Sequence, residues 1–229
     1  MLNYAFVFVR GGSKGLPGKN AKLLNGKPLL EYSIDAAKAC PLISKVFVST
    51  NDNGLARIAK RCGVEVIIRP DELARDDSAE WLAWRHAIEY VSKKYGVFDH
   101  FINLPATSPL RVDEDIENAI SKKITSGADI CIAVSPASRN PYFNMVVKND
   151  NGFFDLALSG DKPISRRQDA PDIFDITTLV YVSTPSFISG HFGLFSGTVA
   201  CIEVPKSRSV DIDDIYDFKL AETILKEKL

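Results

Sequence analysis

An apolar run that leads directly into a glycine-rich, basic loop constrains the fold of this chain more than any other segment. Residues 4–9 form the apolar run, and residues 10–20 form the loop, with the sequence RGGSKGLPGKN. Four glycines let the backbone turn sharply and present N–H groups to an anion, while Arg10, Lys14 and Lys19 add positive charge. The first thirty residues contain five basic residues and no acidic one. The segment predicts a strand followed by a phosphate-binding loop.

The spacing in this loop excludes two common phosphate motifs. A Walker loop requires Gly, four residues and then Gly-Lys-Ser/Thr, but Ser13 stands five residues before Gly18, and Asn20 follows Lys19. The dinucleotide motif G-x-G-x-x-G has no match here either. The alternative interpretation of the segment is a flexible, solvated turn with no ligand.

Strand-like and helix-like segments alternate along the first 135 residues, which is typical of a parallel, doubly wound sheet. Ser78 is the expected N-cap of the third helix, and a single domain over residues 1–229 is expected. The fold class is therefore α/β, Rossmann-like, with a mostly parallel sheet. The expected strands are residues 4–9, 45–49, 64–68, 98–104, 129–134, 179–183 and 199–204, and the expected helices are 28–40, 52–62, 78–94, 113–123 and 213–228.

The pattern changes over residues 136–172, where prolines and turn residues separate short apolar segments. Asn151-Gly152 is a strong signal for a hairpin turn. An excursion of this kind cannot bury its own apolar side chains, so we expect it to pack on a second copy of the chain as a homodimer arm. Its apolar residues include Phe143, Met145, Phe153 and Phe154.

Composition narrows the possible partners. The net charge of −1 and the pI near 6.3 argue against a long nucleic-acid partner, because such partners need a broad basic surface. The first apolar run is too short for a signal peptide or a membrane span, so a cytoplasmic location without membrane contact is expected. The cysteines lie far apart and, with three histidines in no zinc-type spacing, are expected to be reduced core thiols; they are Cys40, Cys62, Cys131 and Cys201.

The order of motifs resembles the acylneuraminate (CMP-sialic acid) cytidylyltransferases. The resemblance begins in the loop and in LNGKPL at residues 24–29, and it continues through the chain. It implies an enzyme that joins CMP from CTP to the anomeric hydroxyl of a sialic acid-like (nonulosonic) acid and releases pyrophosphate, with a dimerisation insert. The later motifs are VSTND at 48–52, RPDELA at 69–74, PATSPLR at 105–111, RRQ at 166–168 and VDID at 210–213.

The resemblance implies a nucleotide site around the loop. Arg10 and Lys19 would contact the triphosphate, and Asn20 would contact the cytidine. Gly11, Gly12 and Ser13 are included through their position in the loop, and Arg69 because it opens the polar cluster after the third strand. Arg10, Lys19 and Asp211 would carry the catalytic electrostatics.

Asp211 and Asp213 are the candidate metal ligands. Two carboxylates two residues apart can both bind one hard cation through oxygen. The alternative role for Asp213 is to cap the last helix, whereas Asp214 is expected to lie on the surface. In the family that the chain resembles, the matching pair holds Mg²⁺, so both residues are assigned to that ion.

The same resemblance assigns Arg167, Gln168 and Tyr181 to the sugar site. The alternatives are a solvated charge cluster for Arg167 and Gln168 and a core position in a strand for Tyr181. Some positions depart from the family pattern. Residues 104–107 read LPAT where a glutamine precedes Pro-Thr in the family, and Asp175 and Thr177 replace an expected Arg and Asn. The sugar is therefore left open among N-acetylneuraminic, legionaminic, pseudaminic and eight-carbon acids.

Two other functions fit parts of the pattern. A nucleotide-sugar glycosyltransferase also combines a Rossmann-like layer with D-x-D, but usually after a mid-chain strand. A catalytically silent nucleotide-binding regulator is the second alternative. Retention of Arg10, Lys19 and both aspartates argues against a silent protein.

Overall fold

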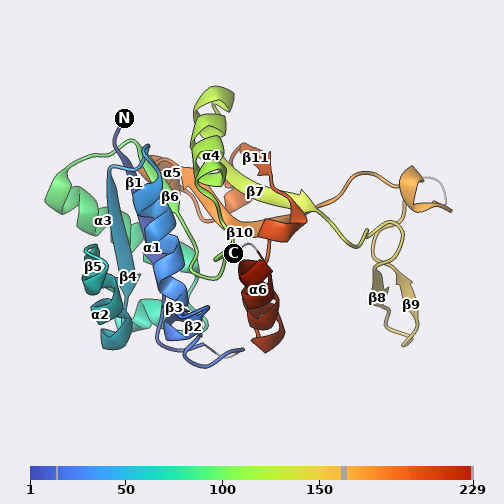
Figure 1. Ribbon diagram of the computed structural model, residues 1–229. Helices are drawn as coiled ribbons and strands as arrows, with labels where there is room; N and C mark the ends of the chain where they lie inside the picture. Colours follow the sequence, from blue (N-terminus) through green and yellow to red (C-terminus); the bar gives the residue numbers. More distant parts are fainter. Residues whose placement is uncertain (14, 161–163, 228–229) are drawn as a thin grey trace.

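A seven-stranded, mostly parallel sheet forms the centre of the molecule, with the strand order β11-β7-β10-β6-β1-β4-β5 (Figure 1). The structure is a computed structural model that describes residues 1–13, 15–160 and 164–227, so Lys14 and the expected helix end at residue 228 lie outside it. The predicted fold class is confirmed. The strands are β1 (Asn3–Phe8), β4 (Lys45–Thr50), β5 (Glu65–Ile68), β6 (His100–Asn103), β7 (Ile130–Pro136), β10 (Phe174–Ser183) and β11 (Val199–Glu203).

One strand of this sheet runs against the others. β10 pairs antiparallel with β6 and with β7, and its register shifts between Thr177 and Tyr181. The pattern of apolar residues predicts a strand here but not its direction. The irregularity removes Leu179 from the ladder, and its carbonyl takes a side-chain partner instead.

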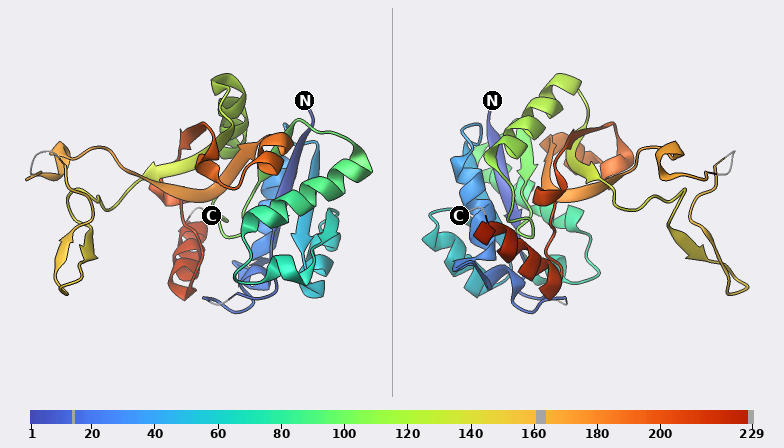
Figure 2. Two further views of the ribbon diagram at one scale, coloured as in Figure 1. Left: turned by 180° about the vertical axis from the view of Figure 1, so that it is seen from behind. Right: turned by 45° about the vertical axis from the view of Figure 1, so that its right-hand side comes forward.

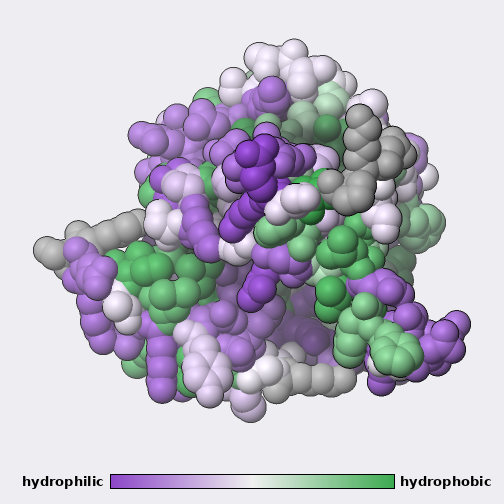
Figure 3. Space-filling model, turned by 90° about the vertical axis from the view of Figure 1, so that its right-hand side faces the viewer, coloured by the Kyte–Doolittle hydropathy of each residue, from purple (hydrophilic) through white to green (hydrophobic). Residues whose placement is uncertain are grey.

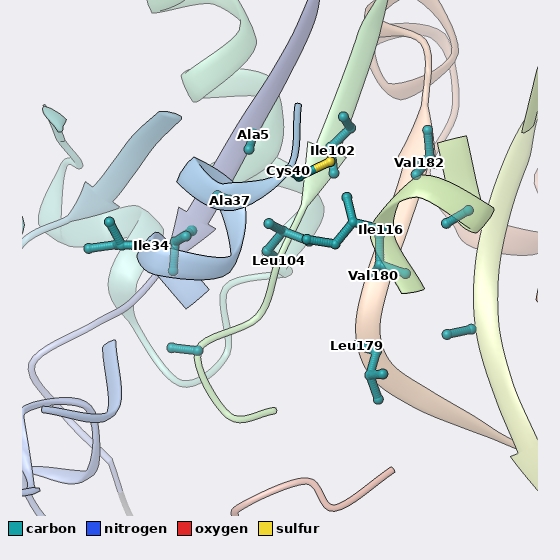
Figure 4. Packing of buried hydrophobic residues seen from close by; sticks show 14 of the residues in the cluster. Ala5, Ile34, Ala37, Cys40, Ile102, Leu104, Ile116, Leu179, Val180 and Val182 are labelled. Carbon is teal, nitrogen blue, oxygen red and sulfur yellow. The ribbon is translucent and has the colours of Figure 1, made fainter. Parts of the chain in front are cut away.

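Helices cover both faces of the sheet (Figures 1 and 2). Alternation along β1 directs Ala5 and Val7 toward one helical layer and Tyr4 and Phe6 toward the other, so each face buries its own apolar cluster. Figure 4 shows the packing of the first cluster. The first layer holds α1 (Leu29–Ala39), α2 (Asn53–Arg61) and α4 (Asp113–Ser126), the second holds α3 (Glu80–Tyr95) and α5 (Pro185–Gly190), and α6 (Ile215–Glu227) packs on a third, smaller cluster.

Local capping explains several helix ends. The Asp52 side chain accepts the Leu55 N–H at 2.8 Å at the start of α2, and Gly96 ends α3 with a φ of 83°. The expectation for Ser78 is wrong. Ala79 occupies the N-cap of α3 without a side-chain cap, and the Ser78 hydroxyl lies one residue too early to reach the first-turn N–H groups. Among the described residues, this buried hydroxyl has no hydrogen-bond partner.

All four cysteines are free thiols, but they do not share one environment. Cys40 and Cys131 are buried, as expected, whereas Cys62 is half-buried and Cys201 is exposed. Cys201 lies on the edge strand β11, where Ala200 and Ile202 pack on the core and Cys201 points to the opposite face. The expectation of a core thiol is therefore wrong for Cys201, because a sheet edge leaves one face of its strand uncovered.

Residues 137–160 and 164–173, between β7 and β10, lie outside the sheet and form a projecting arm (Figures 1 and 2). The arm carries a hairpin of β8 (Val146–Lys148) and β9 (Phe154–Leu156), and Gly152 takes a φ of 84° in its turn. The predicted hairpin is confirmed. A second, shorter hairpin joins β2 (Leu23–Leu24) to β3 (Lys27–Pro28).

The arm leaves large apolar side chains open to solvent. Phe153 is 73% exposed and Phe154 is 65% exposed, and Met145 is exposed as well, whereas Phe143 is half-buried. Figure 3 looks at the side from which the arm projects and shows several hydrophobic patches among hydrophilic residues. Across the described ranges, no helix combines the length and apolar character needed to span a bilayer.

Arg111 joins three parts of the fold beneath the loop that follows β6. Its guanidinium donates to the carbonyls of Leu179 (2.6 Å) and Pro105 (3.0 Å) and to the Ser33 hydroxyl (3.0 Å). Burial lowers the pKa of Arg111 to about 9, so the side chain stays cationic at neutral pH. One buried cation thus fixes α1, β10 and the loop after β6 relative to one another.

We expect Arg111→Met to lower the free energy of unfolding by about 3 kcal/mol, because three buried acceptors lose their charged donor. Urea denaturation measures the change. Arg57→Met serves as the control, since Arg57 is exposed on α2, and it should stay within about 0.5 kcal/mol of wild type. Equal stability of the two variants would contradict the role given to Arg111.

Candidate functional site

A cleft of about 570 Å³ opens beyond the carboxyl ends of β1, β5 and β6. This edge is where ligands bind in open α/β sheets, because the loops that follow neighbouring strands meet there. Two residues of β10, Thr178 and Tyr181, complete the wall. Eight of the predicted site residues line the cleft: Arg10, Gly12, Ser13, Lys19, Asn20, Arg69, Tyr181 and Asp213.

The loop after β4 braces the glycine-rich loop and is not part of the cleft wall. The Gly11 N–H donates to Asn51 Oδ1 at 3.4 Å, and the Asn51 amide donates to Asp71 Oδ1 at 3.1 Å. A side chain at Gly11 would lie 2.8 Å from Asp52 Oδ2, which is closer than real Cβ contacts allow. Gly11, one of the predicted nucleotide-site residues, therefore contacts the loop after β4 and does not line the cleft.

Lys19 links the two ends of the sequence. It lies in a short 3-10 turn, η1 (Lys19–Ala21), and is only 8% exposed. Its ammonium donates to the Ile212 carbonyl and, at 3.2 Å, to Asp213 Oδ1. An ammonium has three N–H donors, so one donor remains for a bound anion.

Ile212 anchors the segment that carries the two candidate metal ligands. Its side chain is fully buried with Leu16 and Phe218, and its N–H donates to the Thr107 carbonyl at 2.9 Å. Burial of Ile212, which stands between the two aspartates, thus holds the Asp211–Asp213 segment against the glycine-rich loop. Gly15 lies so close that a Cβ there would clash with the Asp213 carbonyl.

Asp214, and not Asp213, caps the last helix. Its Oδ1 accepts the N–H groups of Tyr216 at 2.7 Å and Asp217 at 3.0 Å, and α6 begins at Ile215, two residues later than predicted. The capping alternative for Asp213 is therefore wrong. Asp213 keeps 80% of its side chain exposed and faces the cleft beside Lys19.

Asp211 is half-buried next to the cleft. Burial raises the pKa of Asp211, and the nearby Asp213 raises it further, while the hydroxyls of Thr107 and Thr178 and the charge of Lys19 lower it. Its Oδ1 is buried with no hydrogen-bond partner among the described residues. An unpaired buried carboxylate oxygen beside a second carboxylate is a fitting donor set for Mg²⁺.

The aspartates do not form a complete metal cage. Within residues 1–13, 15–160 and 164–227, no group of three or more His, Cys, Asp or Glu side chains could enclose an ion. Magnesium is commonly held by one or two carboxylates together with water and substrate phosphates. The pair therefore suits an ion that arrives with a phosphorylated substrate.

Two arginines add positive charge to the lining of the cleft. Arg10 Nη1 lies 2.6 Å from Asp76 Oδ1, and the Arg10 carbonyl accepts the Asn20 amide at 3.3 Å. Arg69 is 6% exposed and donates from Nη2 to the Val9 carbonyl. Burial lowers the pKa of Arg69, and the negative charge of Glu80 raises it again in part.

Glu80 and Thr178 line the cleft but are absent from the sequence prediction. The sequence identifies Glu80 only as a first-turn residue of α3, and nothing in it signals that the irregular part of β10 brings Thr178 to the wall. Surrounding protein raises the pKa of Glu80, although the residue is open to the cleft. The Trp84 indole N–H donates to Glu80 Oε1 at 3.2 Å.

The predicted sugar-site residues lie in two different places. Tyr181 lies in the cleft with its ring 5.8 Å from the ring of Trp84, and burial, followed by Glu80 and Asp211, raises its pKa. Arg167 and Gln168 are exposed on the arm and do not line this cleft. Arg167 donates to the carbonyls of Ala137 and Ser138 at 3.4 and 3.3 Å.

The chain belongs to the cytidylyltransferase family, whose model matches residues 4–178. It is 32% identical to "Post-translational flagellin modification protein B" of Campylobacter coli, over 97% of this chain and 94% of that protein. It is 29% identical to "CMP-N,N'-diacetyllegionaminic acid synthase" of Campylobacter jejuni, over 97% and 94%. It is 34% identical to "N-acylneuraminate cytidylyltransferase" of Escherichia coli, over 98% of this chain but about half (52%) of that protein.

A solved structure shares the fold. The CMP:2-keto-3-deoxy-manno-octonic acid synthetase complexed with CTP superposes with a TM-score of 0.75 and 16% identity, with both chains covered completely. The predicted resemblance to the acylneuraminate cytidylyltransferases is thus confirmed. Family membership argues against the glycosyltransferase alternative.

We expect Gly15→Ala to lower kcat/KM for CTP on the order of 10²-fold, because the new methyl group must push the glycine-rich loop away from Asp213. Steady-state pyrophosphate release measures the loss, and circular dichroism checks the fold. Gly190→Ala is the matched control, since a Cβ at Gly190 meets no atom within 4 Å. Equal rates in the two variants would show that the close approach is dispensable.

Proposed function

We propose that this chain is a CTP-dependent cytidylyltransferase that activates a sialic acid-like (nonulosonic) acid as its CMP derivative. The observation that carries the proposal is the junction at Lys19, where one buried ammonium joins the glycine-rich loop to the Asp211–Asp213 segment at a single cleft. The printed names of the curated relatives support the same chemistry, since two of them act on legionaminic and acylneuraminic acids.

In the proposed reaction the anomeric hydroxyl of the acid attacks the α-phosphorus of CTP. An oxygen–phosphorus bond forms, the bond to the β-phosphate oxygen breaks, pyrophosphate leaves and the hydroxyl proton is released. Lys19 and Arg10, with the N–H groups of the glycine-rich loop, would hold the triphosphate and offset the negative charge that builds up on it. The geometry assigns no general base.

Asp211 and Asp213 would hold the divalent cation. Their oxygen donors, and the unpaired Oδ1 of Asp211 in particular, fit Mg²⁺. When bound, Mg²⁺ would neutralise phosphate charge and favour departure of pyrophosphate. Lys19 would then orient Asp213 through its existing contact.

The acid would lie on the β10 side of the cleft, next to Tyr181 and Thr178. Arg167 and Gln168 lie on the arm, outside this cleft. In a homodimer, the arm of one copy could bring them to the sugar carboxylate in the other copy, where an arginine suits bidentate binding. We therefore propose a homodimer in which residues 136–172 are a dimerisation and sugar-site excursion of one domain.

We place the enzyme in the cytoplasm. Its proposed co-substrate CTP is a cytoplasmic metabolite, and the exposed Cys201 and half-buried Cys62 remain free thiols, as is usual in a reducing compartment.

The direct test is pyrophosphate release from CTP and Mg²⁺ with a panel of N-acetylneuraminic, legionaminic, pseudaminic and eight-carbon acids. Release with one acid establishes the reaction and its substrate together. Bound CTP without release for any acid would favour the silent-regulator alternative.

We expect Arg10→Ala and Asp211→Asn each to lower kcat by about 10²- to 10³-fold while the protein stays folded, because each removes a preorganised charge from the site. Assays of pyrophosphate release measure the rate, and thermal unfolding shows whether each variant is folded. Arg57→Ala is the control, because Arg57 is exposed on α2 and does not line the cleft. Wild-type turnover in either variant would remove that residue from the mechanism.

We expect the double substitution Phe153→Asp and Phe154→Asp to convert the dimer to a monomer, because it places two charges in the exposed apolar hairpin. Sedimentation velocity at micromolar concentration measures the change. Val97→Asp is the control, since Val97 is 88% exposed outside the arm. A wild-type protein that sediments only as a monomer would contradict the proposed dimer.

A further inference from the structure

A row of three hydroxyl side chains leads to the carboxylate of Asp211, one of the two proposed metal ligands. The Ser108 and Thr178 hydroxyls lie 2.7 Å apart, and the Thr107 hydroxyl lies 3.5 Å from that of Thr178. The hydroxyls of Thr107 and Thr178 are close enough to Asp211 to lower its pKa, against the effect of burial. The backbone supports the same arrangement, because the Ile212 N–H donates to the Thr107 carbonyl at 2.9 Å. The row thus connects the protein interior to a carboxylate beside the cleft.

The irregular part of β10 fixes the position of Thr178. The register of β10 against β7 shifts between Thr177 and Tyr181, and Thr178 lies in this shifted part and lines the cleft. The carbonyl of the next residue, Leu179, accepts Arg111 Nε at 2.6 Å, which holds the backbone there. A β-branched side chain has few χ1 rotamers, so its hydroxyl follows the backbone closely. The Thr178 hydroxyl is therefore held in one place beside the Asp211–Asp213 segment.

The buried end of the row decides the direction of its hydrogen bonds. Ser108 is fully buried, and within the described part of the chain its hydroxyl bonds only to Thr178 Oγ1. If Thr178 donated to Ser108, the Ser108 proton would be left without an acceptor in the interior, which costs free energy. Ser108 therefore donates, and Thr178 keeps its own proton for a second acceptor. An ionised carboxylate offers only acceptor sites, so Asp211 is a stronger acceptor than the Thr107 hydroxyl at 3.5 Å.

We propose that Thr178 is a positioning residue whose hydroxyl, held by Ser108, donates a hydrogen bond to Asp211 and orients this carboxylate for the divalent cation. This inference rests on the proposed function. Hydrogen bonds to a metal ligand fix its orientation, and their loss typically lowers metal affinity or activity by about 10- to 100-fold. Asp211 Oδ1 has no partner among the described residues and stays available to the ion. Ser108 does not line the cleft, so it can act only through Thr178.

The test measures CTP binding by calorimetry with and without Mn²⁺, in the absence of any acid, so that it does not depend on turnover. Thr178→Val keeps the shape of the side chain and removes the hydroxyl. We expect it to reduce the gain in CTP affinity that Mn²⁺ provides by about 10-fold, while CTP affinity without metal stays at the wild-type value. Thr178→Ser restores the hydroxyl and should recover most of the gain. Thr125→Val is the matched control, since Thr125 is exposed on α4, outside the cleft.

Ser108→Ala separates positioning from direct contact with a ligand. Because Ser108 lies outside the cleft lining, we expect this variant to reduce the same Mn²⁺-dependent gain through the Thr178 hydroxyl alone. Residues that act through one hydrogen-bonded chain are not additive, so Ser108→Ala should have no further effect when combined with Thr178→Val. Thermal unfolding without metal shows whether each variant is folded. Fully additive losses in the double variant would contradict the proposed chain.

The failure of this inference can be told apart from the failure of the proposed function. No wild-type turnover of CTP with any acid defeats the proposed function. Wild-type turnover together with an undiminished Mn²⁺-dependent gain in Thr178→Val, or a change confined to KM for the acid, overturns the role of Thr178. Equal losses in Thr178→Val and Thr178→Ser, or no gain from Mn²⁺ in the wild type, also overturn it. If Thr178→Val fails to fold, Thr178→Ala replaces it in the same comparison with Thr178→Ser.

Discussion

The buried ammonium of Lys19 is the interaction on which the site depends. A lysine with 8% exposure needs strong acceptors, and it finds them 193 and 194 residues later, in the Ile212 carbonyl and the Asp213 carboxylate. Ile212 adds hydrophobic burial to the same junction. Because the Lys19 ammonium and the Ile212 side chain anchor the same junction, the glycine-rich loop and the two aspartates lie side by side.

The rest of the cleft is assembled by a second buried cation and by an irregular strand. β10 runs antiparallel and interrupts its ladder, which frees the Leu179 carbonyl for Arg111 and turns Thr178 toward the cleft. Arg111 also holds the Pro105 carbonyl of the neighbouring loop. Lys19 and Arg111 thus position walls of the cleft, and Arg10 and Arg69 add two further cations to its lining.

Local patterns predicted most of the fold but only part of the site. Apolar alternation located the strands of the sheet, and Asn151-Gly152 located the hairpin, because both signals act within a few residues. Ser78 was misassigned as a cap, and capping stayed open as the alternative role of Asp213, because capping depends on where a helix begins to within one residue. Glu80 was missed because a first-turn acid is ordinary in any helix, and only its position over the cleft distinguishes it.

By itself the sequence determined the layered α/β fold, the loop after the first strand and the family, since periodicity, glycine placement and motif order are properties of short segments. Tertiary structure alone decided which predicted residues meet. It brought Arg10, Lys19, Arg69, Tyr181 and Asp213 to one cleft and left Arg167 and Gln168 on the arm. The reason is that packing between distant segments sets these separations, and the register and direction of β10 depend on partners that no local pattern specifies.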